Sequence, residues 1–139
     1  MKRDNEERYE GFLIFAEEDL RSARVLLKEG IFNQVCFHSQ QVVEKSLKSF
    51  IKSKKRISPK THSLLELLNI CSQYDKKFKT LLNICKFLDK FYIPTRYPDA
   101  IVGSLNEELP NKRDAEKALK SAEIVYNFVK KILSSSTYE

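Results

Sequence analysis

The chain has 139 residues, of which 42% are hydrophobic and 32% are charged, and its formal net charge is +6. This length and mixture suit one folded domain and argue against intrinsic disorder. No apolar run approaches the roughly 18 residues that cross a membrane, and the charged start, MKRDNEERYEG, lacks the apolar centre of a secretory signal, so we expect a cytoplasmic protein without membrane contact.

Apolar residues recur with the helical period of 3.6 along almost the whole sequence. The first such stripe predicts a helix over about residues 4–29, with Gly30 just beyond its end. Asn33 is a candidate cap for a second helix over about 33–53, and the pair Ser58-Pro59 interrupts the chain after it.

The middle of the chain predicts two shorter helices. Thr61 or Ser63 can start a third helix, because either hydroxyl can accept a hydrogen bond from a backbone N–H of the first turn. Asp75 suits the start of a fourth helix, whose apolar stripe reaches Tyr92 before Pro94 ends it.

The last part of the chain predicts a fifth helix that opens at Asn111 or Lys112. No segment alternates with the period of two that a strand requires. The predicted fold is therefore all-α, an up-and-down bundle of about five helices. We expect one domain over 1–139, with its core over about 9–133 and a frayed tail over 134–139.

The cysteine and glycine patterns argue against a metal centre and against the common cofactor sites. No spacing typical of zinc ligands occurs, so we expect buried free thiols at Cys36, Cys71 and Cys85. The three glycines stand alone, and neither GxGxxG nor GxxxxGKS or GxxxxGKT is present. We expect no cofactor and no metal, and any bound nucleotide must be held by side chains or helix ends.

The predicted second helix carries an unusual polar face, which contains His38, Gln41, Lys45 and Lys48. A histidine and a glutamine one turn apart can both donate and accept hydrogen bonds, so they could hold a phosphate or read a base edge. The same groups could instead bond across a dimer interface or cap another helix.

Seven basic residues and no acidic residue lie between Lys45 and Lys60. Such a block is an electrostatic footprint for phosphate or another polyanion. The alternative is structural, because lysines near a helix C-terminus favour the helix dipole by about 0.3–1 kcal/mol each and remain solvated.

The stretch FYIPTRYPDA, residues 91–100, concentrates further chemistry in one predicted loop. Arg96 keeps its proton and can clamp a phosphate with two hydrogen bonds, and Tyr97 offers a ring for stacking. Two prolines restrict the backbone around the arginine. In the alternative interpretation Arg96 pairs with Asp99 or Asp89, and the aromatic residues close the end of the bundle or contact a second copy.

Four segments occur in the order and spacing of one family: CFHSQQVVEKSLKSFI, THSLLELL, LDKFYIPTRYPDA and a last helix that begins DAEKALKSAEIV. Over residues 9–133 the chain resembles the HEPN domain (higher eukaryotes and prokaryotes nucleotide-binding domain), in its small stand-alone prokaryotic type. The resemblance implies a bundle of about five helices, usually a homodimer. It also implies a minimal nucleotidyltransferase as partner, in an arrangement that looks like a toxin–antitoxin pair.

Many HEPN proteins are metal-independent ribonucleases with an R-x4-6-H motif in the last helix region, and here this chain departs from the family. Its predicted last helix contains Arg113 but no histidine. Arg56 and His62 have the right spacing, yet they lie earlier in the chain and Pro59 separates them. We therefore assign no catalytic residue, and we expect His62 either to help start the third helix or to face the same cleft as Arg96.

The leading interpretation is a dimeric HEPN protein that binds a nucleotide or an RNA phosphate and acts with a nucleotidyltransferase. The alternatives are a ribonuclease toxin with a variant active site and a module that only binds other proteins. The candidate ligand-binding residues are Arg96, Tyr97, His38, Gln41, Lys45, Lys48, Asp99 and His62.

Overall fold

A computed structural model describes residues 2–55, 57, 59–92 and 109–136, with side chains placed from Tyr9 onward. Within these described ranges the chain forms five α-helices and one 3-10 helix, and it contains no strand. This confirms the predicted all-α fold. Within the same ranges, no helix is both long and apolar enough to cross a membrane.

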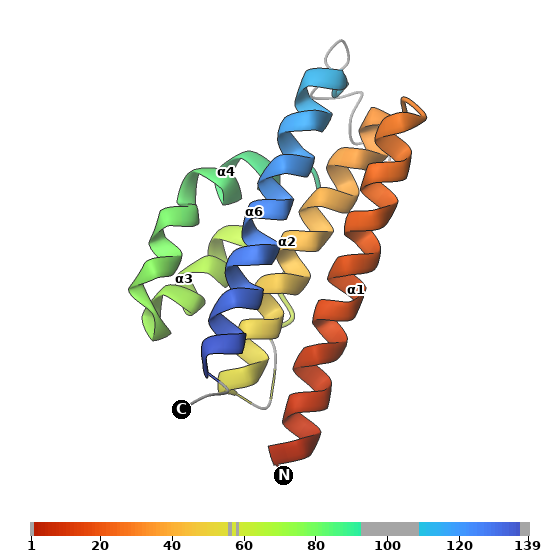
Figure 1. The fold of residues 1–139 in the computed structure, drawn as a ribbon. Helices are drawn as coiled ribbons and strands as arrows, with labels where there is room; N and C mark the ends of the chain where they lie inside the picture. The colour runs from red at the N-terminus through yellow and green to blue at the C-terminus, as the bar shows by residue number, and fades with distance from the viewer. Residues whose placement is uncertain (1, 56, 58, 93–108, 137–139) are drawn as a thin grey trace.

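Three long helices make the body of the molecule: α1 (Lys2–Lys28), α2 (Phe32–Lys54) and α6 (Lys112–Ser136). They lie side by side, and α1 runs in the opposite direction to α2 and α6 (Figure 1). Helix α2 is central, since it packs against α1, α6, α3 and α4. Helix α6 ends at Ser136, so it continues into the segment predicted as a tail.

A short arm packs on the side of the long helices (Figure 1). It consists of α3 (Leu64–Tyr74), the 3-10 helix η1 (Lys76–Leu81) and α4 (Leu82–Asp89). The sequence predicts one continuous helix after Asp75. The chain instead makes a 3-10 turn there, because the Asp75 side chain accepts from the Lys77 amide at 2.9 Å and Phe78 must be fully buried directly after it.

The turn between α1 and α2 explains why one cap prediction is wrong. Gly30 has φ 76°, and its amide and that of Ile31 donate to Leu27 and Leu26, which is a Schellman ending. Gly30 therefore ends the first helix as predicted. The chain enters α2 at once, with Ile31 as N-cap and no side-chain cap bond. Asn33 already lies in the first turn of α2, so it is not the cap.

The other predicted starts are confirmed. Ser63 caps α3 by accepting from the Glu66 amide at 3.2 Å. Asn111 and Asp114 bond each other's backbone amides at 2.9 and 3.1 Å before and within the first turn of α6, which is a reciprocal capping box.

The core runs along α2 and joins the long helices to the arm. Phe78 of η1 lies between Phe50 of α2 and Phe128 of α6, with ring centroids 4.5 and 5.1 Å away. The three cysteines are buried free thiols, as predicted. Burial raises the pKa of Cys36 and of Cys85 to about 12 and raises that of Cys71 as well, so these thiols stay protonated.

Candidate functional site

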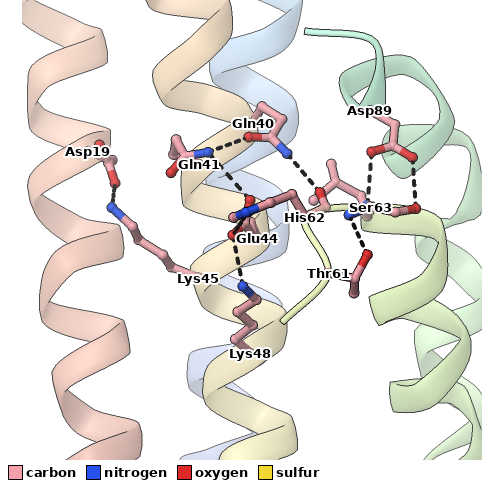
Figure 2. Close-up of polar contacts among 11 residues, drawn as sticks. Asp19, Gln40, Gln41, Glu44, Lys45, Lys48, Thr61, His62, Ser63 and Asp89 are labelled. Carbon is pink, nitrogen blue, oxygen red and sulfur yellow. Dashed lines mark hydrogen bonds and ion pairs between the residues drawn. The ribbon is translucent and has the colours of Figure 1, made fainter. Parts of the chain in front are cut away.

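The polar face of α2 is covered by protein on two sides. Helix α1 lies along one side, and the segment that leads into α3 lies along the other (Figure 2). Lys48 of this face is buried, together with Gln40 and Glu44 beside it, so the alternative in which the lysines remain solvated does not hold for Lys48. Five candidate residues are described, and the other three, Arg96, Tyr97 and Asp99, lie outside the described residues.

Asp19 of α1 joins two of the candidates. Its carboxylate oxygens lie 2.8 Å from His38 Nδ1 and 2.5 Å from Lys45 Nζ, and the Lys45 contact is drawn in Figure 2. We call these three residues the Asp19 cluster. Burial by itself favours the neutral carboxyl and is the largest influence on it, but the hydrogen bonds and charges of His38 and Lys45 outweigh burial and lower the pKa of Asp19. Asp19 is thus a carboxylate that ties α2 to α1.

The ionised Asp19 also determines which ring atom of His38 is available. A carboxylate accepts hydrogen bonds only, so Nδ1 must carry the proton that points to Asp19. The opposite nitrogen, Nε2, is then the atom that can meet another group. His38 is held as an oriented imidazole rather than a free surface side chain.

Glu44 joins three further candidates on the other side of α2. Its carboxylate lies 3.0 Å from Lys48 Nζ, 2.9 Å from His62 Nδ1 and 3.4 Å from Gln41 Nε2. Glu44 is only 5% exposed and Lys48 only 8%, so this is a buried ion pair that also holds a histidine. With Gln40, these residues form the Glu44 cluster.

Gln40 completes the connection between α2 and the start of the arm. It is fully buried, accepts from Gln41 Nε2 at 2.7 Å, and donates to the His62 carbonyl at 3.3 Å. Figure 2 shows both contacts beside Glu44. The Glu44 cluster therefore binds the backbone and the ring of His62 together.

The segment around His62 also reaches the end of α4. Asp89 accepts from the Leu64 amide at 2.9 Å and from Ser63 Oγ at 3.4 Å (Figure 2). The His62 ring stacks on Tyr92, with centroids 4.6 Å apart and planes 14° from parallel. The His62 side chain remains 52% exposed. Ser63, not His62, is the cap of α3, so His62 serves to connect α2 with the residues that follow α4.

Three residues that sequence reasoning did not select hold the site together: Asp19, Gln40 and Glu44. A signal was present for two of them, because Gln40, Glu44 and Lys48 recur at spacings of four, which places them on one helical face. Their position next to Val42 and Val43 also indicates partial burial. Asp19 gave no such signal, since it lies on another helix.

The ion pairs of Lys45 and Lys48 limit how these two lysines can bind a ligand. Lys45 and Lys48 already have carboxylate partners, so an incoming phosphate must compete with Asp19 or Glu44 for them. The two histidines each retain one ring nitrogen for such a contact. No group of three or more potential metal ligands occurs among the residues that the structure describes.

Asp19→Asn is expected to lower the free energy of unfolding by about 1.5–3 kcal/mol at pH 7, the range for hydrogen bonds to charged groups. Because folding lowers the pKa of Asp19, its contribution is fully present above the ordinary value of 3.8 and is lost as pH falls through the folded value. Urea titrations between pH 7 and pH 3 measure the free energy of unfolding of both proteins. The difference between their free energies should be constant down to about pH 5 and should become smaller at lower pH. A difference that widened in acid would contradict this assignment.

Comparisons with known proteins agree with this architecture. The model of the HEPN domain matches residues 9–132. The protein named "Putative toxin MJ1304" of Methanocaldococcus jannaschii is 32% identical over 130 residues, which cover 88% of this chain and 86% of that one.

Two solved structures are similar in fold and in sequence. The crystal structure of TT1696 from Thermus thermophilus has a TM-score of 0.80 at 33% identity, covering 89% of this chain and 97% of the other. The structure of ST0689, an archaeal HEPN homologue, has a TM-score of 0.69 at 33% identity, covering 88% and 94%. On this evidence, the chain belongs to the HEPN domain family.

Proposed function

We propose that this protein is a toxin-like HEPN protein that binds a nucleotide or an RNA phosphate. The name of the Methanocaldococcus jannaschii relative supports the toxin-like role. The family resemblance supports a homodimer that acts with a minimal nucleotidyltransferase, in a pair of the toxin–antitoxin kind.

The observation that carries the proposal is the stack of His62 on Tyr92 beside the Glu44 cluster. It brings a half-exposed imidazole, an aromatic ring and a lysine from three separate parts of the chain to one place. Tyr92 is followed in sequence by the segment with Arg96, Tyr97 and Asp99. Phosphate binding requires fixed cations and donors, and base binding requires flat rings, so this combination suits a nucleotide.

Thermal unfolding of the native protein with ATP, GTP or a short RNA is expected to shift to higher temperature with at least one of them. A ligand at about 100 times its Kd stabilises the folded state by about 2.7 kcal/mol, which corresponds to a rise of roughly 5–10 °C for a domain of this size. Arg96→Ala should remove most of the rise, because the clamp on the phosphate is lost.

Arg24→Ala is the matched control, since it removes the same charge from an exposed residue that pairs with Glu123. The proposal fails if no ligand raises the unfolding temperature of the native protein, or if Arg96→Ala keeps the full rise.

The oriented imidazole of His38 favours a second candidate function, an RNA-cleaving toxin. A histidine whose Nδ1 is held by a carboxylate is arranged to accept a proton at Nε2. Incubation with total RNA in EDTA separates the two functions. Cleavage that disappears in both Arg96→Ala and His38→Ala would favour the enzyme over the binding protein.

A further inference from the structure

A hollow of about 590 Å³ lies between α1 and α2, next to the Asp19 cluster. Its size falls within the range of small-molecule sites. Most of its described wall comes from one face of α1. The described lining residues are Glu18, Arg21, Ser22, Val25, Leu26 and His38.

His38 connects the hollow with the Asp19 cluster. Asp19 occupies Nδ1, so Nε2 is the ring nitrogen that can meet a ligand. The ring cannot turn freely, because a turn would break its bond to an ionised carboxylate. A positioned donor or acceptor in a hollow of this size is a feature of binding sites.

Arg21 supplies the charge. It makes no hydrogen bond or ion pair with any other residue that the structure describes, whereas Arg24, less than one turn further along α1, pairs with Glu123 at 3.0 Å. Lys45 is likewise occupied by Asp19. Of these three cations, Arg21 is the one whose guanidinium can form two hydrogen bonds with a phosphate without first leaving a carboxylate.

The rest of the wall matches the other parts of a nucleotide. Val25 is 60% exposed and Leu26 is partly buried, so together they offer an apolar surface for a base or a sugar ring. Ser22 can donate to a phosphate oxygen, and the Glu18 carboxylate can accept from ribose hydroxyls.

We propose that this hollow is a nucleotide site in which Arg21 and His38 hold the phosphate. The inference rests on the proposed nucleotide binding and adds a second site for it, on the α1 side of α2 and apart from the His62–Tyr92 stack. Asp19 acts here as a positioning residue through His38. The expected ligand is one nucleotide unit, either free or at the phosphorylated end of an RNA chain.

Isothermal titration of the full chain with each nucleoside monophosphate, with a short RNA that carries a 5′-phosphate and with inorganic phosphate tests the site. Arg21→Ala should weaken nucleotide binding at this second site about tenfold or more, because a charge-assisted pair is lost. Arg24→Ala, the matched control, should bind as tightly as the native chain. Binding of the 5′-phosphorylated RNA without binding of any monophosphate would identify the phosphorylated end of an RNA as the ligand. Binding of a nucleoside monophosphate would identify a free nucleotide as the ligand.

Val25→Glu is a second variant, which places a negative charge in the hollow; this charge repels the phosphate and should also prevent binding. Equal affinity of Arg21→Ala and the native chain would overturn the site while nucleotide binding itself stands. Equal weakening by Arg21→Ala and Arg24→Ala would show attraction by general charge and would also overturn it. Absence of binding to every probe by the native chain would overturn both the site and the proposed function.

Discussion

Glu44→Leu is expected to destabilise the protein by about 3–5 kcal/mol, the cost of leaving one member of a buried ion pair without its partner. Lys48 is 8% exposed, so its ammonium group would stay largely out of water with no carboxylate beside it. His62 Nδ1 and Gln41 would lose an acceptor as well. Thermal unfolding should show a midpoint that falls by roughly 10–20 °C.

The double variant Glu44→Leu with Lys48→Met separates the charge from the packing. Replacing both members of a buried pair by apolar residues of similar volume is often neutral or stabilising, so much of the lost stability should return. Glu116→Leu, on the exposed face of α6, should stay within about 0.5 kcal/mol of the native protein. A double variant as unstable as Glu44→Leu alone would show that the buried charge is not the source of the effect.

The helical fold follows from the sequence because each long helix repeats its apolar residues with one period. Ala16, Leu20 and Ala23 lie on one stripe of α1, and all three are buried. The helix starts at Ser63 and Asn111 were readable for a similar reason, since a cap bonds within its own turn. These interactions form within a single helix or helical turn, so they can be predicted from the sequence alone.

The two polar clusters depend instead on which helix lies next to which. A helical wheel places His38 and Lys45 on one face of α2, but it cannot show that Asp19 on α1 lies opposite. Gln40 and Glu44 were readable as neighbours of Lys48, yet their contact with His62 requires the chain to return after α2. The roles of Arg96, Tyr97 and Asp99 stay predictions.

Together the Asp19 and Glu44 clusters connect the polar face of α2 to the neighbouring parts of the fold. The Asp19 carboxylate ties α2 to α1, and the Glu44 carboxylate ties it to the segment that begins the arm. Each carboxylate takes Nδ1 of one histidine and so leaves Nε2 for another partner. Residues that looked like a row of free ligands are thus mainly structural, and what they offer a ligand is two oriented imidazoles.

Phe78→Ala is expected to cost about 3–5 kcal/mol, because it removes a fully buried ring that the surrounding helices cannot replace. The ring joins η1 to Phe50 of α2 and Phe128 of α6, so it anchors the arm to the long helices. Urea unfolding should show the loss as a lower midpoint with an unchanged slope. Phe78→Leu keeps more of the volume and should cost clearly less.

Hydrogen exchange can show whether the arm loosens before the whole molecule unfolds. The Leu64 amide donates to Asp89 and therefore reports the connection between the start of α3 and the end of α4. In Phe78→Ala its protection should fall more than that of amides in the middle of α2, because the lost contact belongs to the arm. Equal loss in both places would mean that arm and long helices open as one unit, and Phe78 would then be a general core residue rather than the anchor of the arm.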